Sequence, residues 1–309
     1  MKKYFIITVD TEGDNLWKYK KGETITTINT KYLPRFQSLC NKYGFKPVWL
    51  TNYEMAADEQ FVKLAKTWEK EGLCEIGIHL HAWNNPPLYN LNAIYNGNPY
   101  LVEYPYNIMH EKFSCLYNLI KDKFGTTPIT HRAGRWVMNE TYFKLLKEFN
   151  IKVDCSVTPG INWKNVKGET QGGCDYSLAS QNPYKINGIL EVPMTIRDFK
   201  IPIAFDLKHI YRIIRYGHEE TWMRPCSSST KILKRLCKSI HESSETDYIE
   251  FMIHSSELMP GGSPYFKTEY SVEKLYQSLD KMFMYAKSLG FEGVTLREYA
   301  NIHHSFIVD

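Results

Sequence analysis

Three apolar runs, far apart in the sequence, end in acidic or histidine residues. The polar positions are Asp10, Glu12 and Asp14 after the first run, His79 and His81 at the end of the second, and His254 at the end of the third. Packing alone seldom places such groups at the ends of core strands, because burying them unpaired is costly. In α/β barrels the carboxyl ends of the strands build the active site. The pattern therefore predicts a barrel with a polar site at one end.

Apolar runs of strand type alternate with helix-period segments along the whole chain, as in parallel strands joined by helical crossovers. Strands are expected at residues 4–10, 46–51, 75–81, 129–133, 151–157, 189–195, 248–254 and 293–296. Helices are expected at residues 30–43, 58–71, 107–124, 139–149, 207–216, 228–242 and 271–289. Asn139 and Ser271 are the expected N-caps of two helices, and Gly290 is expected to end the last one. This order predicts a distorted (β/α)7–8 barrel as a single domain over residues 1–309.

Two long segments, residues 82–106 and 158–188, interrupt this alternation and are rich in Gly, Pro and Tyr or Asn. Loops of that length inside a compact domain tend to be functional. Both follow strands, so both are expected at the rim of the site, where they would shape a cleft.

Composition narrows the classes of partner and compartment. A net charge of +4 without a long basic stretch argues against nucleic acid as a partner. The seven cysteines are scattered and form no CxxC pair, which favours a reducing compartment. No stretch is long and apolar enough to span a bilayer or act as a signal peptide, so a cytoplasmic location is expected. The 22 Tyr and 7 Trp allow stacking on a carbohydrate ligand.

The His-x-His pair predicts a metal site. Residues i and i+2 of a strand point to the same face, so His79 and His81 project together, as do Asp10 and Glu12. We expect these two strands to be neighbours and the four side chains to meet. Two imidazoles and a carboxylate are suitable ligands for a catalytic divalent ion, for which zinc is the first expectation.

Two further strand ends carry groups suited to catalysis. His254 can donate a proton to a leaving group near neutral pH. Arg132, in the segment Thr130–Trp136, can hold a carboxylate by a bidentate contact, and Arg135 can do the same or be a solvated residue. Asp154 is another acid on an expected strand.

These segments resemble, in order, the motifs of the polysaccharide deacetylases of carbohydrate esterase family 4. Thr8-Val9-Asp10-Thr11 is similar to Thr-Phe-Asp-Asp, and Gly77-Ile78-His79 is similar to the start of Gly-x-His-Thr/Ser-x-x-His. Arg132–Trp136 loosely resembles Arg-x-Pro-x-Gly, and Phe251–His254 resembles Leu-x-Ile/Leu-x-His. The resemblance implies a distorted barrel that hydrolyses N-acetyl or O-acetyl groups on sugars.

The resemblance also implies roles for individual residues. Asp10 would be the general base, His254 the general acid, and Arg132 the residue that orients the base. The metal-binding Asp of the family is Thr11 here, and Trp83 stands in place of the second histidine. Glu12 or Asp14 could replace that Asp, and His81 could replace that histidine. Trp83 and Trp136 are the expected substrate contacts.

The leading hypothesis is metal-dependent N-deacetylation of an amino sugar, or of a nucleotide-linked or lipid-linked sugar, in surface-polysaccharide assembly. One alternative is a metal-independent C–N hydrolase that acts on a cyclic amide or ureide. Another is a barrel that binds carbohydrate without turnover. The oligomeric state, the sugar, the acyl group and the choice between Glu12 and Asp14 stay open at this point.

Overall fold

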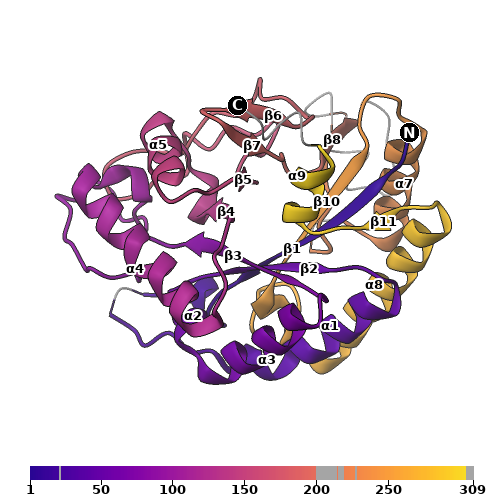
Figure 1. Ribbon diagram of the computed structural model, residues 1–309, viewed down its shortest axis with the longest axis horizontal. Helices are drawn as coiled ribbons and strands as arrows, with labels where there is room; N and C mark the ends of the chain where they lie inside the picture. The colour runs from indigo at the N-terminus through magenta and orange to yellow at the C-terminus, as the bar shows by residue number, and fades with distance from the viewer. Residues whose placement is uncertain (21, 200–213, 215–218, 227, 304–309) are drawn as a thin grey trace.

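A curved sheet lies at the centre of the molecule, and helices cover its outer face (Figure 1). The computed structural model describes residues 1–20, 22–199, 214, 219–226 and 228–303. The strands follow the order β10 (Tyr248–His254), β1 (Tyr4–Thr11), β2 (Pro47–Thr51), β3 (Glu75–Leu80), β4 (Thr130–Ala133), β5 (Val153–Asp154), β7 (Ile189–Glu191) and β6 (Tyr184–Ile186). Neighbours along this order are parallel, except for β6 and β7, which are antiparallel. A short β11 (Glu292–Gly293) pairs with the beginning of β1.

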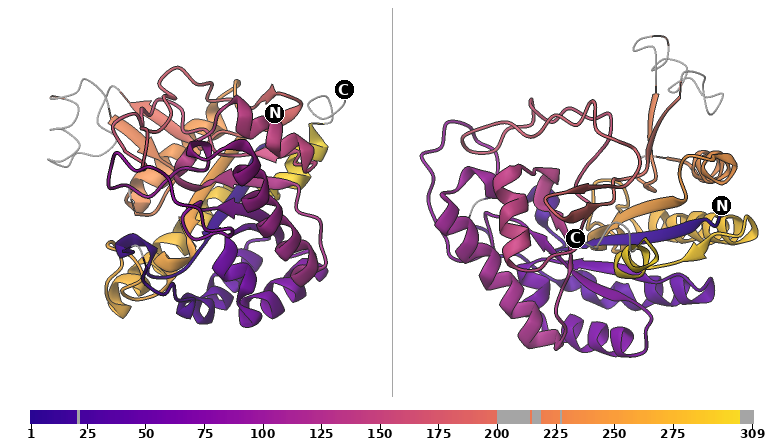
Figure 2. Two further views of the ribbon diagram at one scale, coloured as in Figure 1. Left: turned by 90° about the vertical axis from the view of Figure 1, so that its left-hand side faces the viewer. Right: turned by 45° about the horizontal axis from the view of Figure 1, so that its top comes forward.

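Most helices lie between successive strands and pack on the outside of the sheet. These are α1 (Leu33–Lys42), α2 (Tyr53–Ala57), α3 (Glu59–Lys70), α4 (Tyr106–Phe124), α5 (Glu140–Glu148), α7 (Thr230–Glu242) and α8 (Glu269–Ser288). Helix α9 (Leu296–Ile302) follows β11 instead. Short 3-10 turns cover Leu16–Lys18, Ile28–Tyr32, Leu101–Glu103, Gly134–Trp136 and Ser255–Leu258. Strands β8 (Ile196–Phe199) and β9 (Glu219–Trp222) form a separate two-stranded ribbon that extends outward from the barrel (Figure 2).

Two apolar layers lie on opposite faces of the sheet. The large outer layer joins alternate strand residues, such as Phe5, Ile7 and Val9 of β1, to the helices. The small inner layer includes Tyr4 and Ile6 of β1, which point the other way. Residues of α9 belong to the inner layer, so this helix closes the end of the barrel at which the strands begin. The opposite end, at the carboxyl ends of the strands, is left for polar side chains.

These observations confirm the expected distorted barrel, with several corrections in detail. The strands at residues 4–10 and 75–81 are not neighbours, because β2 lies between β1 and β3. Strand pairing in the segments 151–157 and 189–195 is limited to two and three residues, and Leu296, expected in a strand, begins α9. Strands β6, β8 and β9 and helices α2 and α9 were not expected. The expected helix at 207–216 lies outside the described residues, apart from position 214.

Helix caps illustrate what local sequence does and does not predict. Asn139 caps α5 as expected, because its Oδ1 accepts a hydrogen bond from the backbone N of Tyr142 at 2.8 Å. Ser271 does not cap α8: Thr268 does, and its Oγ1 accepts from the backbone N of Ser271 at 3.2 Å. Ser271 Oγ in turn accepts a hydrogen bond from the backbone N of Thr268 at 3.0 Å, so the two residues form a capping box. Gly290, with φ of +85°, follows the end of this helix as expected.

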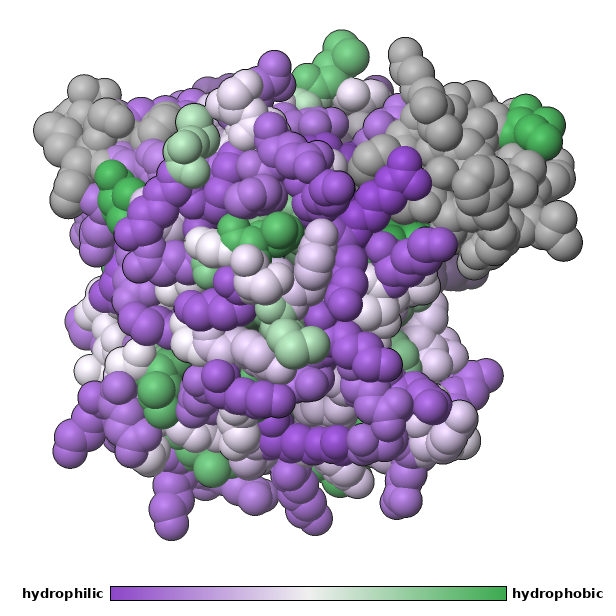
Figure 3. Space-filling view, turned by 90° about the vertical axis from the view of Figure 1, so that its right-hand side faces the viewer, coloured by the Kyte–Doolittle hydropathy of each residue, from purple (hydrophilic) through white to green (hydrophobic). Residues whose placement is uncertain are grey.

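The surface that carries α7 and α8 is largely hydrophilic, with only small, separate apolar patches (Figure 3). Among the helices within the described ranges, none is long and apolar enough to cross a membrane.

Candidate active site

Alternation along β1 brings two polar side chains into the barrel interior. Tyr4 and Ile6 fill its closed end, and Thr8 and Asp10 follow on the same face toward the open end. Glu12, just beyond the strand, continues in this direction. A cavity of about 360 Å³ opens above these residues at the carboxyl ends of the strands. Its lining includes Asp10, Glu12, His79, His81 and His254, so the structure brings together residues from all three apolar runs.

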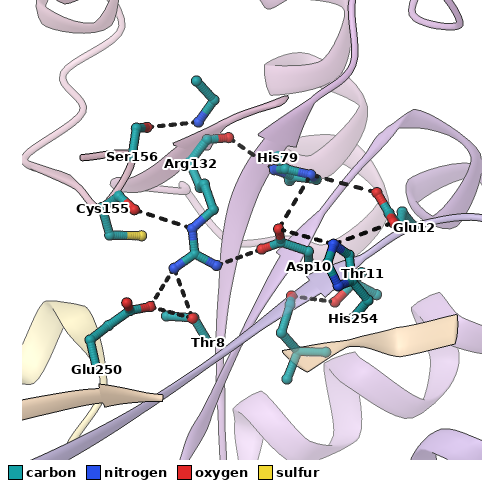
Figure 4. Close-up of polar contacts among 12 residues, drawn as sticks. Thr8, Asp10, Thr11, Glu12, His79, Arg132, Cys155, Ser156, Glu250 and His254 are labelled. Atoms are coloured by element: carbon teal, nitrogen blue, oxygen red, sulfur yellow. Dashed lines mark hydrogen bonds and ion pairs between the residues drawn. The ribbon is translucent and has the colours of Figure 1, made fainter. Parts of the chain in front are cut away.

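Beneath the cavity, Arg132 of β4 holds two carboxylates (Figure 4). Its Nη1 donates to Asp10 Oδ1 at 2.5 Å, and its Nη2 donates to Glu250 of β10 and to Thr8 Oγ1, the latter at 2.8 Å. Its Nε donates to the carbonyl oxygen of Cys155 at 3.2 Å. Arg132 and Glu250 are fully buried, and Asp10 is 2% exposed. Arg132 thus fixes one oxygen of Asp10 and leaves Oδ2 facing the cavity.

Glu12, His79 and His81 form the group with metal-ligand character. One ligand atom from each lies within 4.8 Å of the others, and all three side chains are buried. Glu12 Oε2 lies 2.7 Å from His81 Nε2 and 3.7 Å from His79 Nε2. The donor set of two imidazoles and one carboxylate is that of a catalytic zinc site with an open position, so these residues fit a divalent ion.

The orientation of His79 supports this assignment. Its Nδ1 lies 3.1 Å from the carbonyl oxygen of Arg132, to which it donates when protonated. This bond orients the ring so that Nε2 is directed at Glu12 and Asp10. Burial opposes protonation of this imidazole, but the two carboxylates raise its pKa. Histidines that bind metals usually donate from their other ring nitrogen in this way.

Electrostatics keep both acids of the cavity ionised. Burial opposes ionisation of Asp10, but the charges of Arg132, His79 and His254 together lower its pKa. Burial also opposes ionisation of Glu12, but hydrogen bonds from His79 and His81 lower the pKa of this carboxyl strongly. Burial lowers the pKa of His81, with a further contribution from neighbouring His79, so its imidazole is held neutral. An ionised carboxylate and a neutral imidazole are the forms that bind a metal.

His254, the last residue of β10, lies next to Asp10 and Glu12 in the cavity. Its Nε2 lies 3.9 Å from Asp10 Oδ2 and 3.8 Å from Glu12 Oε1. On the other side of the ring, Nδ1 lies 3.3 Å from Glu257 Oε2 and 3.1 Å from Arg224 Nη2. Protonated Nδ1 is satisfied by Glu257, whereas unprotonated Nδ1 is satisfied by Arg224. His254 therefore has a partner in either protonation state while Nε2 faces the cavity.

Three other residues singled out in the sequence lie outside this group. Asp14 accepts hydrogen bonds from Thr26 Oγ1 and from the backbone N of Asn29, so it stabilises the loop after β1. Thr11 bonds to the carbonyl oxygen of Val9 at 2.9 Å. Asp154 points to the outer face of the sheet, where it pairs with buried His131 at 2.6 Å.

Aromatic residues build the walls of the cavity. Trp83 packs against His81 with ring centroids 4.2 Å apart, and Trp136 lies beside Arg132, whose guanidinium carbon is 4.9 Å from its ring. Trp136 and Arg135 have φ of +66° and +58°, a left-handed conformation that costs energy in residues other than glycine and often marks functional sites. Arg135 donates to the carbonyl oxygens of Asn98 and Lys167, which joins the two long rim segments.

Sequence reasoning missed several residues that complete the site. Period-two spacing places Glu250 on the face of His254, but it assigned Glu250 no role, and Thr8 could have been found by the same spacing from Asp10. Trp17, which packs over the His254 ring at 4.8 Å, and Arg224 follow no motif. Both come from segments outside the expected strands, so only the folded chain brings them to the cavity.

The fold is that of the polysaccharide deacetylases whose motifs the chain resembles, although no protein-family model and no curated protein matches the sequence. A putative polysaccharide deacetylase from Mycobacterium smegmatis is similar over 100% of this chain and 93% of its own, with a TM-score of 0.55 and 11% identity. A 4-alpha-glucanotransferase from Thermococcus litoralis is similar over 97% of this chain, with a TM-score of 0.57 and 14% identity. This chain covers only 40% of the latter. Likeness at such low identity establishes the fold, and the function has to be argued from the site.

Proposed function

We propose that the protein hydrolyses an N-acetyl group on an amino sugar. The observation that carries this proposal is the placement of Asp10 and His254 beside the group Glu12, His79 and His81, within one cavity. Hydrolysis of an amide needs a base that activates water, stabilisation of the oxyanion, and an acid that protonates the leaving nitrogen. These side chains supply the base and the acid, and a metal site beside both.

Glu12, His79 and His81 would hold a divalent ion, for which zinc is the first candidate. When bound, such an ion polarises the acetyl carbonyl and stabilises negative charge on its oxygen. Asp14, the second carboxylate considered from the sequence, is excluded from our ligand set because Thr26 and Asn29 hold it elsewhere.

Asp10 and His254 would carry the proton transfers. Asp10 Oδ2 accepts a proton from water as the water oxygen bonds to the acetyl carbon and the carbonyl electron pair moves onto its oxygen. His254 Nε2 then gives a proton to the amide nitrogen as the C–N bond breaks, which releases acetate and the sugar amine. Arg132 acts as a positioning residue, since it fixes Asp10 Oδ1 and thereby aims Oδ2. Glu257 Oε2 lies 3.3 Å from His254 Nδ1, on the side of the ring away from the cavity, and helps to hold Nε2 toward it.

The proposal is tested by measuring acetate released from a panel of N-acetylated sugars, with protein that has been stripped of metal and reloaded with zinc. We expect release that depends on zinc, is abolished in Asp10→Asn, and persists in the control Asp14→Asn. Turnover of a cyclic ureide that survives strong chelation would replace this function with the cyclic-amide hydrolase. Sugar binding without any acetate release from the zinc-loaded protein would favour a carbohydrate-binding barrel.

We also propose a cytoplasmic location. All seven cysteines lie in the described part of the chain, and none of them forms a disulfide there, which suits a reducing compartment. A substrate made inside the cell, as in surface-polysaccharide assembly, fits that location.

A further inference from the structure

Exposed aliphatic side chains lie on the loops around the mouth of the catalytic cavity. Leu88, Ile94, Val166 and Leu178 are 77%, 73%, 42% and 100% exposed. They belong to the two long rim segments, which follow β3 and β5. The surface that carries α7 and α8 is in contrast largely hydrophilic (Figure 3). A single exposed apolar residue is ordinary, but a group of them on one rim indicates an interaction surface.

The loops that carry these residues are neighbours in space. The backbone N of Ile94 donates to the carbonyl oxygen of Glu169 at 2.7 Å, which joins the two rim segments. Val166 lines the catalytic cavity. Leu88 and Glu169 line the adjoining cavity together with Tyr19, which belongs to the loop after β1. The exposed apolar residues of the rim segments therefore lie around one opening.

Three loops of this rim carry exposed lysines beside an exposed aromatic or apolar residue. The lysines are Lys18 and Lys20 after β1, Lys164 and Lys167 in the second rim segment, and Lys267 after β10. Their neighbours in sequence are Trp17, Val166 and Tyr265. The rings of Trp17 and Tyr265 have centroids 5.6 Å apart, so the loop after β10 belongs to the same rim.

Positive charge exceeds negative charge on the exposed parts of these loops. In their described residues, the exposed acids are Glu23 and Asp175, and Asp175 pairs with Lys164 at 3.1 Å. Residues 88–96 of the first rim segment contain no charged residue at all. The rim therefore combines apolar side chains with a surplus of lysines.

This combination distinguishes between the partners that an apolar rim could meet. Aliphatic side chains neither stack on a pyranose as aromatic rings do nor bond to its hydroxyls, so a glycan would gain little from them. In a bilayer they become buried at the boundary between headgroups and acyl chains, and lysines beside them attract anionic headgroups. We propose that this rim docks the open end of the barrel on an anionic membrane surface.

Docking in this orientation has a consequence for the substrate. The mouth of the catalytic cavity then faces the membrane, so a substrate held at that surface by a lipid anchor is delivered to it. This favours a lipid-linked amino sugar among the substrates that the sequence left open. The consequence rests on the deacetylase function proposed above, whereas docking itself does not.

Co-sedimentation of the full chain with vesicles tests the docking. The vesicles consist of phosphatidylcholine alone, or of phosphatidylcholine and phosphatidylglycerol in equal parts. We expect the protein to bind the anionic vesicles, to bind them less tightly as the salt concentration rises, and to bind the neutral vesicles weakly.

Two double variants with the same change of net charge locate the contact. Lys18→Glu/Lys20→Glu reverses two charges on the rim, whereas Lys66→Glu/Lys70→Glu reverses two exposed charges of α3. Lys66 and Lys70 line a pocket with residues of α9, at the closed end of the barrel. We expect the rim variant to bind anionic vesicles at least about tenfold less tightly, because each lysine near the surface contributes about fivefold. The α3 variant should stay near wild type.

A second matched pair tests the apolar contact. Leu178 on the rim is 100% exposed and Met284 on α8 is 51% exposed, so neither substitution by serine disturbs the core. We expect Leu178→Ser to bind anionic vesicles at least about threefold less tightly, because the apolar area buried in the bilayer is lost. Met284→Ser should bind as wild type does.

The inference is overturned if the protein does not bind anionic vesicles, or if the rim and α3 double variants weaken binding equally. Equal binding of Leu178→Ser and Met284→Ser would also overturn it, since the protein would then only adsorb through its charge. These outcomes are separable from that of the proposed function, because acetate release is measured without membranes. Rim-dependent vesicle binding by a protein that releases no acetate would leave the docking surface standing and remove the catalytic proposal.

Discussion

Replacement of Arg132 by methionine should destabilise the protein and slow its reaction, and the two effects are separable. Arg132 bonds to both Asp10 and Glu250, and all three side chains are at most 2% exposed. Methionine fills much of the same volume, so the main change is the loss of a buried charge and its hydrogen bonds. Two carboxylates then remain in the interior without their cation.

Removal of one partner from a buried ion pair costs about 3–5 kcal/mol. We therefore expect Arg132→Met to lower the free energy of unfolding by about that amount near neutral pH. The loss should shrink in acid. Arg132 helps to keep the pKa of Asp10 in the folded protein below its value in the unfolded chain. The stabilisation that results is fully present above the unfolded-state pKa of Asp10, and it is lost as the pH falls through the folded-state pKa. Burial raises the pKa of Glu250, and loss of Arg132 raises it further. In acid, Glu250 of the variant is therefore protonated, and the unpaired buried charge that destabilises the variant is removed.

Urea unfolding followed by circular dichroism, at about pH 7 and about pH 4.5, measures these differences. The double variant Arg132→Met/Glu250→Gln should recover at least about 1 kcal/mol of the loss, because only one carboxylate is then left unpaired. Its rate should stay at least roughly tenfold below wild type, since Asp10 still lacks its positioning partner. A loss below about 1 kcal/mol for the single variant, or equal losses at both pH values, would refute this reasoning.

Asp10→Asn should abolish turnover while zinc content, measured by plasma emission spectrometry, stays near wild type. Glu12→Gln and His81→Ala should each lower zinc affinity by roughly tenfold or more in chelator competition, because each variant lacks a side chain that binds the metal directly. Asp14→Asn should leave zinc affinity unchanged. His254→Ala should be impaired on the amide substrate far more than on an activated acetyl ester, whose leaving group needs no proton.

Each of these outcomes has a contrary result that is informative. Equal loss of zinc and activity in Asp10→Asn would make Asp10 a ligand. Zinc loss in Asp14→Asn as large as in Glu12→Gln would contradict the ligand group inferred from the structure. Equal impairment of His254→Ala on amide and ester would remove His254 from the acid role.

Period-two alternation gave a reliable account of the individual strands. It places Asp10 on the inner face of β1 and His79 on that of β3, and it predicts that Glu250 and His254 share a face of β10. Alternation is local, because it follows from the backbone geometry of one strand. The barrel and the polar end of its strands could therefore be predicted from sequence.

Alternation could not say which strands are neighbours. β2 separates β1 from β3, yet Glu12 and His81 still meet, because the sheet curves and both side chains point into the same interior. The choice between Glu12 and Asp14 was also undetermined, since both follow the strand at even spacing from Asp10. Thr26 and Asn29, from the next segment of the loop, hold Asp14 away from the cavity.

The sequence by itself determined the barrel class and the strand ends that carry the acids and histidines. These depend on hydrophobic periodicity and residue type within short segments. Only the tertiary structure decided which of those residues form a ligand group and that Arg132 bonds to both Asp10 and Glu250. The physical reason is that such contacts join segments far apart in the chain, so they follow from the curvature of the sheet and from loop packing.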